Sequence, residues 1–176
     1  MYQRQGELGM DEVQLRVVEI KKTEDLNFIV GQTHFIKSIE DLYEVMTTSV
    51  PSGKFGIAFS EASGACKIRS EGNDESLKKL AEANATAIGA GHTFIIFMKD
   101  CYPLNVLNAI KNLPEVCTIF CATANPTKVV VAETKLGKET GRGILGVIDG
   151  FIPKGRENTE ELAWRKKFLR DIHYKL

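Results

Sequence analysis

Apolar residues fall into short runs and alternations that are separated by amphipathic segments. Apolar runs or two-residue alternation predict strands over Val13–Ile20, Leu26–Val30, Lys54–Ser60, Cys66–Ser70, His92–Met98, Val116–Ala122, Lys128–Glu133 and Ile144–Asp149. Helical spacing predicts helices beginning at Ser38, near Asp74, at Pro103 and near Asn158. We find no repeat and no linker between two halves. The pattern predicts one compact α/β or α+β domain with a mixed β-sheet and about four helices.

Local signals add detail to two of these elements. Ser38 with Asp41 three positions later is an acidic variant of the capping box, which predicts a helix N-terminus directly after His34. On the strand Lys54–Ser60, small Gly56 and Ala58 share one side. That side is expected to be packed closely by a helix or by another subunit.

Composition excludes several classes of protein. The 176 residues carry 23 Lys+Arg and 23 Asp+Glu, and this balance argues against a nucleic-acid-binding module. Apolar runs are far shorter than the roughly 20 residues of a membrane-spanning helix. Residues 1–9 are polar, without the apolar segment of a secretory signal, and we expect a flexible extension before a domain at 10–176. The expected location is the cytoplasm.

The cysteines and histidines show no pattern typical of a metal site. Cys117 and Cys121 lie four apart in an apolar run, so that they should share a face, and we interpret them as buried thiols in preference to metal ligands. The spacing of the three histidines does not match a zinc site. No metal-ligand set is predicted from spacing.

Glycine motifs do not indicate a known nucleotide cradle. The segment 141–146 matches G-x-G-x-x-G, but its glycines precede an apolar strand instead of opening a helix, which favours a glycine-rich hairpin over a dinucleotide site. Gly137-Lys138 is followed by Glu139, where a phosphate-binding P-loop needs Ser or Thr.

Five polar segments directly follow apolar strands, at 31–34, 60–64, 100–103, 123–126 and 149–155. If several strands run the same way, these segments meet at one rim of the sheet, where ligands commonly bind. That rim would hold His34, Glu61, Ser63, Asn125, Asp149 and Lys154. The alternative is a set of unrelated turns, some of which face the opposite end because neighbouring strands are antiparallel.

Histidines and asparagines supply further candidates. His34 precedes a helix N-terminus and could bind phosphate, exchange a proton or carry a phosphoryl group, or it could be a simple turn residue. His92 begins a buried strand, at the end of the sheet less used for ligands, and is interpreted as structural. Asn105, Asn108 and Asn112 share one helical face, which indicates hydrogen bonding to the structure or to a ligand.

Several of these segments together resemble one family. The matching blocks are 31–37, 55–64, 88–92, 105–111, 120–126 and 141–150, and the resemblance to the archaeal and bacterial adenosine-specific kinase domain runs from about Met10 to Leu176. It implies a compact α/β domain in a trimer-based homo-oligomer that binds adenosine nucleotides such as AMP. It also implies a histidine that holds a phosphoryl group. His34 and His92 both lie in matching blocks, so the resemblance does not choose between them.

The leading hypothesis is a phosphotransferase that binds AMP, ADP or ATP and acts through a phosphohistidine on His34. Glu61 or Asp149 would orient the histidine or hold a divalent ion such as Mg²⁺, and Arg142 and Lys154 would neutralise phosphate. The candidate catalytic residues are His34, His92, Glu61 and Asp149, and the candidate nucleotide-binding residues are Ser63, Asn105, Asn108, Asn125, Arg142, Gly143 and Lys154. The alternatives are a non-catalytic AMP-binding or sensor oligomer and a purely structural oligomer.

Overall fold

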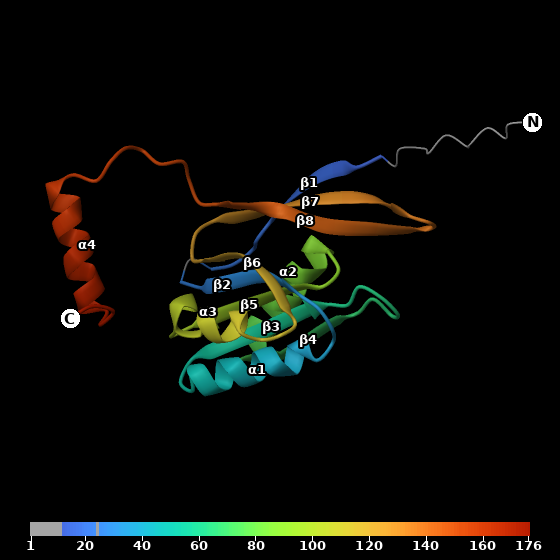
Figure 1. The fold of residues 1–176 in the computed structure, drawn as a ribbon, viewed down its shortest axis with the longest axis horizontal. Helices are drawn as coiled ribbons and strands as arrows, with labels where there is room; N and C mark the ends of the chain where they lie inside the picture. The colour runs from blue at the N-terminus through green and yellow to red at the C-terminus, as the bar shows by residue number, and fades with distance from the viewer. Residues whose placement is uncertain (1–11, 24) are drawn as a thin grey trace, which may run out of the picture.

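The computed structural model describes residues 12–23 and 25–176. Within these residues, four helices and eight strands form an α+β fold (Figure 1). The expected extension at 1–9 lies outside the described residues, as do Met10 and Asp11 at the start of the predicted domain. The class and the number of helices agree with the prediction.

The larger sheet has five strands in the order β4-β3-β5-β2-β6. Their bounds are β2 Asn27–Thr33, β3 Lys54–Ser60, β4 Ile68–Gly72, β5 Thr93–Lys99 and β6 Val116–Thr123. Each neighbouring pair is antiparallel. The sequence predicts one mixed sheet. The structure has two sheets, and all neighbouring strands of this larger one are antiparallel.

The smaller sheet has three antiparallel strands in the order β1-β7-β8. Their bounds are β1 Gln14–Glu19, β7 Thr127–Leu136 and β8 Glu139–Asp149. The predicted glycine-rich hairpin is confirmed, and it is longer than expected: β8 begins at Glu139, and the turn is reduced to Gly137 and Lys138. Gly137 makes this tight turn possible with a φ of 66°.

Helices cover both faces of the five-stranded sheet. Helices α1 (Ser38–Ser49) and α3 (Pro103–Lys111) lie on one face, while α2 (Glu75–Ile88) and the smaller sheet lie on the other (Figure 1). Alternation along β2 divides its residues between them, because Ile29 packs under α1 and α3, whereas Phe28 and Val30 pack toward α2 and β7. Helix α4 (Thr159–Asp171) stands apart from both layers.

Two local predictions are resolved by the packing. A Cβ added to Gly56 would lie 2.1 Å from the backbone nitrogen of Lys78, so the small side of β3 accommodates α2 and not another subunit. Helix α1 begins at Ser38 as predicted, but the capping box is absent: the residue before the helix is Lys37, with no side-chain cap, and the Ser38 hydroxyl donates to the Phe35 carbonyl at 2.6 Å.

The cysteine prediction is partly wrong. Cys101 and Cys121 are buried, and burial raises the pKa of the Cys121 thiol to about 12, but Cys66 and Cys117 are exposed. Register shifts between β2 and β6 interrupt the alternation of β6, so Cys117 and Cys121 do not share a face. Across residues 12–23 and 25–176, no helix has the length and apolar character needed to cross a membrane.

Candidate functional site

His34 and His92 lie side by side at one end of the five-stranded sheet. Because β2 and β5 are antiparallel, the residue after β2 meets the residue before β5, and the two ring centroids are 5.7 Å apart with their planes nearly perpendicular. His34 is exposed, whereas His92 is half-buried and stacks on Phe59. The prediction that His92 lies at the other end of the sheet is therefore wrong.

Backbone hydrogen bonds hold both histidines. The Thr33 N–H donates to the His92 carbonyl at 2.9 Å, the His34 N–H to the Glu115 carbonyl at 2.7 Å, and the His92 N–H to the Ser60 carbonyl at 2.8 Å. His92 has a φ of 61°, and the residue after His34, Phe35, has a φ of 85°. Such conformations are costly for side chains other than glycine and concentrate at ligand sites. We call this region the histidine end.

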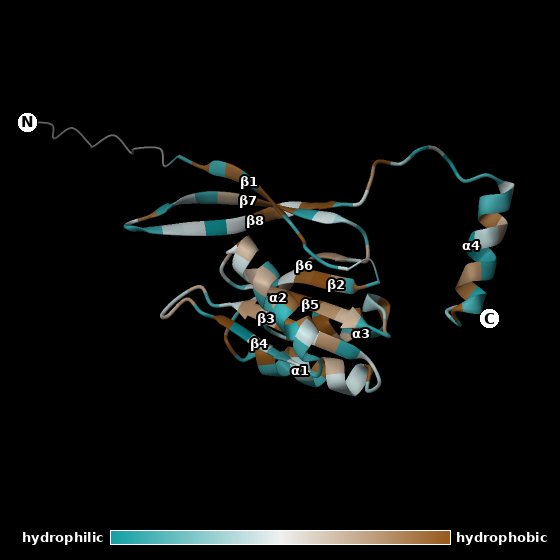
Figure 2. Ribbon diagram, turned by 180° about the vertical axis from the view of Figure 1, so that it is seen from behind, coloured by the Kyte–Doolittle hydropathy of each residue, from teal (hydrophilic) through white to brown (hydrophobic). Residues whose placement is uncertain are grey.

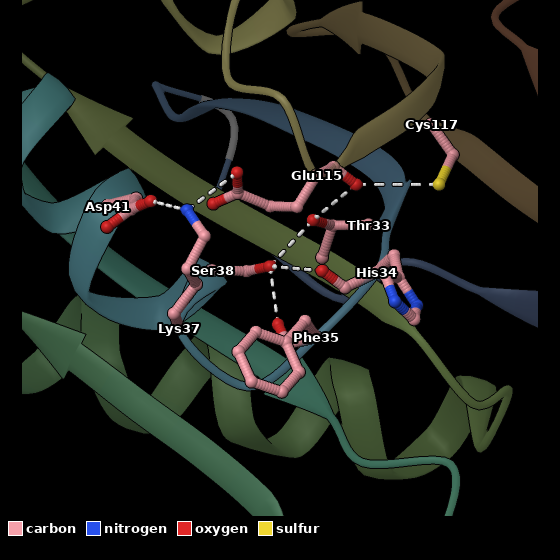
Figure 3. Close-up of polar contacts among 8 residues, drawn as sticks. All are labelled: Thr33, His34, Phe35, Lys37, Ser38, Asp41, Glu115 and Cys117. Atoms are coloured by element: carbon pink, nitrogen blue, oxygen red, sulfur yellow. Dashed lines mark hydrogen bonds and ion pairs between the residues drawn. The ribbon is translucent and has the colours of Figure 1, made fainter.

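A polar cluster, buried at Glu115 and exposed at Lys37, supports the histidine end from the side of α1 (Figure 3). The Lys37 ammonium lies 2.9 Å from Oε2 of Glu115 and also pairs with Asp41. The hydrogen bond to Asp41, followed by that to Glu115, raises the pKa of Lys37, and the Lys37 hydrogen bond lowers the pKa of Asp41. Glu115 is only 6% exposed, and its Oε1 has no hydrogen-bond partner in the described part of the chain.

Glu61 also reaches the histidine end, but its carboxylate is already engaged. Oε1 accepts from the Arg69 guanidinium at 2.7 Å, and Oε2 accepts from the Lys67 N–H at 3.0 Å. These two hydrogen bonds, the first being the stronger cause, lower the pKa of Glu61. Glu61 is thus placed to hold Arg69 beside the site.

A cleft of about 570 Å³ opens between the end of β3, the C-terminus of α2 and the β7–β8 hairpin; Gly91, the residue before His92, lines it, whereas neither histidine does. This volume lies within the range of small-molecule sites. Ser60 lines the cleft and is 4% exposed, and its hydroxyl has no hydrogen-bond partner among the described residues. Buried hydroxyls are normally paired, so this one is an unsatisfied group in the wall of the cleft. Glu61, Gly91 and Arg142 line the same cleft.

Arg142 has a structural task within the cleft wall. Its Nε donates to Glu133 at 2.6 Å, and its Nη1 donates to the carbonyls of Ala87 and Ile88 at 3.3 and 3.2 Å. These carbonyls lie in the last turn of α2, where a cation is favourable. Arg142 therefore joins the smaller sheet to α2. Gly143, the next residue on β8, faces open space, because a Cβ added there would have no atom within 4 Å among the described residues.

Several predicted site residues lie at the opposite end of the sheet, which we call the arm end. Asp149 Oδ1 accepts from the Thr123 hydroxyl and from the Asn125 amide, both at 2.9 Å. Thr123 pairs with Phe28, six residues before His34, which corresponds to about 20 Å along an extended strand. Asp149 and Asn125 therefore cannot contact a group that is bound to His34.

The remaining candidates are also separate from the histidines. Asn105 belongs to α3, where its side chain accepts from the Tyr102 N–H at 2.9 Å and caps the helix, and Asn108 is exposed on the same helix. Lys154 lies in the exposed chain after β8, and Ser63 in the exposed turn between β3 and β4. The predicted single rim is thus divided: segments 31–34 and 60–64 meet, and the other three lie elsewhere.

Sequence reasoning did not single out Ser60, Lys37, Arg69 or Glu115. Ser60 stands in the segment 60–64, but nothing in the sequence indicates that its hydroxyl is buried without a partner. Glu115 directly precedes β6, and its position beside His34 depends on the pairing of β6 with β2. In the described part of the chain, no group of three or more His, Cys, Asp or Glu side chains could hold a metal ion.

Comparison with known proteins gives a family match and a similar solved structure. The family model described as "Adenosine specific kinase" matches residues 18–175, nearly the whole chain and both histidines. The chain belongs to the adenosine-specific kinase family. It is also similar to the crystal structure of the PH1918 protein from Pyrococcus horikoshii OT3, with 44% identity and a TM-score of 0.86 over 94% of this chain and 99% of that one. No curated protein sequence matches. The family match confirms the resemblance inferred from the sequence blocks.

Proposed function

We propose that the histidine end and the adjacent cleft bind an adenosine nucleotide, AMP, ADP or ATP, and transfer a phosphoryl group through His34. The observation that carries this proposal is the meeting of His34 and His92 at one end of the sheet, with a 570 Å³ cleft that reaches Gly91 beside His92, in a chain of the adenosine-specific kinase family. All four cysteines are free thiols, which fits the cytoplasm as the place of action. We also propose that the protein is a homo-oligomer based on a trimer.

His34 is the better phosphoryl acceptor because it is exposed, while His92 is half-buried against Phe59. A neutral ring nitrogen of His34 would attack the terminal phosphorus of ATP. The N–P bond forms, the P–O bond to ADP breaks, and the proton of the other ring nitrogen passes to water. The 5′-hydroxyl of adenosine would then attack the phosphorus: the O–P bond of AMP forms, the N–P bond breaks, and the hydroxyl proton passes to the ring nitrogen, which restores the neutral imidazole.

Neighbouring cations support a phosphate at this place. Lys37, at the start of α1, and Arg69, on β4, border a second hollow of about 340 Å³. Both side chains are held by carboxylates, Lys37 by Glu115 and Asp41 and Arg69 by Glu61. The cleft, with the unpaired hydroxyl of Ser60, would take the nucleoside. Among the candidate ligands for Mg²⁺, Glu61 is the carboxylate nearest to this arrangement.

A non-catalytic AMP-binding protein is the second candidate. It is favoured by the same ion pairs, because Glu61, Asp41 and one oxygen of Glu115 are all engaged by cations. A carboxylate held in this way is a weak general base. In that case the phosphohistidine would be a stable mark with no onward transfer.

Intact-protein mass spectrometry at neutral pH tests the proposal. Incubation of the purified protein with ATP and Mg²⁺ should add about 80 Da, the mass of one phosphoryl group, and the added mass should be acid-labile. His34→Asn should abolish it. His92→Asn should retain it and lower the melting temperature, and His173→Asn, in the exposed turn after α4, is the matched control.

Product analysis then separates the two candidates. Formation of AMP from adenosine by the wild type, but not by His34→Asn, supports the phosphotransferase, whereas AMP binding in calorimetry without product supports the non-catalytic reading. An added phosphoryl group that persists in His34→Asn and disappears in His92→Asn would refute the assignment to His34. Absence of both nucleotide binding and phosphorylation in the wild type would refute the function itself.

A further inference from the structure

Helix α4 exposes an apolar face that nothing in residues 12–23 and 25–176 covers. None of its residues is buried, and Trp164 and Phe168, one turn apart, are 65% and 42% exposed and stack with ring centroids 5.3 Å apart. Figures 1 and 2 show the helix away from both sheets, at the end of an extended segment. Its C-terminal turn approaches α3 through Tyr174 and Tyr102.

Helix α4 has a favourable N-terminal cap but is too short to be stable without packing. Asn158 and Glu161 form both hydrogen bonds of a capping box at its N-terminus. With 13 residues, however, an isolated helix is marginal in water, and most helical stability in proteins comes from packing of the apolar face. A partner surface for Trp164 and Phe168 is therefore expected.

The chain between β8 and α4 leaves the body in a fixed direction. Gly150 has a φ of 71°, and its N–H donates to the Pro126 carbonyl at 3.0 Å. The bonds from Thr123 and Asn125 to Asp149 hold the preceding residue. Beyond this anchor, Phe151 and Ile152 are both more than four-fifths exposed. We call residues 150–176 the arm.

A complementary surface lies on the smaller sheet. The alternation of β1, which predicted the strand, places Leu15 and Val17 on the side turned away from the core, and they are 68% and 57% exposed. Register places Gly143, Gly146 and Ile148 of β8 on the same side. A Cβ at either glycine would meet nothing within 4 Å, so a helix can approach this side closely. We call it the outer face.

We propose that the arm of one copy packs its Trp164 and Phe168 face against the outer face of a second copy of this chain. The exposed parts of Phe151, Trp164 and Phe168 amount to roughly 400 Å². A stable interface buries about 800 Å² per partner, so one arm contact supplies about half of that area, and each copy makes two such contacts when it both gives an arm and receives one. Because arm and outer face are different surfaces, the contact is head-to-tail, and such contacts give a closed ring when the rotation between copies closes and a filament when it does not.

Sedimentation equilibrium at micromolar concentration tests the exchange. The wild type should be an oligomer, and the pair Trp164→Glu and Phe168→Glu should reduce it to a monomer with an unchanged circular-dichroism spectrum for the body. Leu15→Glu with Val17→Glu should do the same from the receiving side. Lys166, two residues from both Trp164 and Phe168, lies on the opposite side of α4 and is exposed, so Lys166→Glu should leave the oligomer intact.

A mixture of the two double variants gives the sharpest result. One retains an intact arm and the other an intact outer face, so together they should form a 1:1 heterodimer although each alone is monomeric, and this heterodimer should be weaker than the wild-type oligomer because it has a single arm contact. A monomeric wild type, an oligomer that survives either double variant, or a mixture that stays monomeric would overturn the proposal. These readouts do not depend on nucleotide binding, so the proposed function can fail or hold separately.

Discussion

Both ends of the five-stranded sheet carry polar side chains, but these differ in how completely they are hydrogen-bonded. At the arm end, Thr123, Asn125 and Asp149 close a network in which each side chain has a partner. At the histidine end, Ser60 and one oxygen of Glu115 are buried without hydrogen-bond partners among the described residues. Left-handed backbone does not separate the two ends, because it occurs at Phe35 and His92 and also at Asp100. A closed network stabilises a fold, while unpaired buried polar atoms are typical of a site that awaits a ligand.

Substitution of Asp149 is expected to have the largest effect and tests whether the two ends are independent. Replacement by Ala removes two hydrogen bonds and leaves the buried Thr123 hydroxyl without its acceptor. We expect a loss of about 1–2 kcal/mol in the free energy of unfolding, or a few degrees in melting temperature, with unchanged AMP affinity in calorimetry. Asn108→Ala on exposed α3 is the control and should change neither quantity. If AMP affinity falls as far in Asp149→Ala as in His34→Asn, Asp149 belongs to the nucleotide site and the distinction between the two ends is wrong.

Ser60 should respond in the opposite direction. Replacement by Ala removes a buried hydroxyl that has no partner, so we expect the nucleotide-free protein to gain about 0.5–1 kcal/mol, seen as a higher melting temperature. AMP should bind about tenfold more weakly, since the cleft loses its free hydroxyl.

Ser70 on the neighbouring strand β4 is the matched control for Ser60. Its hydroxyl donates to Glu82, so Ser70→Ala should lower the melting temperature slightly and leave AMP affinity unchanged. If Ser60→Ala proves destabilising, the hydroxyl has a partner within the fold, and the distinction between an open and a closed end fails there.

Periodicity was sufficient to predict most strands and helices but not how they meet. The apolar run of β2 and that of β5 are plain in the sequence, yet the meeting of His34 with His92 follows from their antiparallel pairing. Hydrogen bonds between backbones determine that direction, and they leave no mark on side-chain pattern. For the same reason Asp149 and Asn125 were expected beside His34 and lie at the other end.

Alternation likewise predicts a strand without saying which face is covered. On β1 the apolar set Leu15 and Val17 is exposed, although such a set usually faces a core. Arg142 was expected to meet phosphate and instead caps α2, a role that depends on the position of the β7–β8 hairpin. Family blocks located the important histidines, whereas Glu115 and Lys37 became candidates only through contacts between distant segments.

The smallest expected effect concerns acid stability at the histidine end. The hydrogen bond from Lys37 lowers the pKa of Asp41 below its ordinary value of 3.8. The folded state therefore gains stability from this carboxylate above about pH 4, and it loses that gain as the pH falls through the lowered pKa.

Asp41→Asn removes the titrating group and so isolates this contribution. Between about pH 5 and 7 the wild type should melt at a slightly higher temperature than the variant, and the difference should shrink toward zero at lower pH. The effect is small because Lys37 is exposed to solvent, which screens the pair. Thermal unfolding of both proteins across this range measures it. A difference that stays constant down to about pH 2 would mean that Asp41 acts through packing, and the ion pair beside His34 would then be only a surface contact.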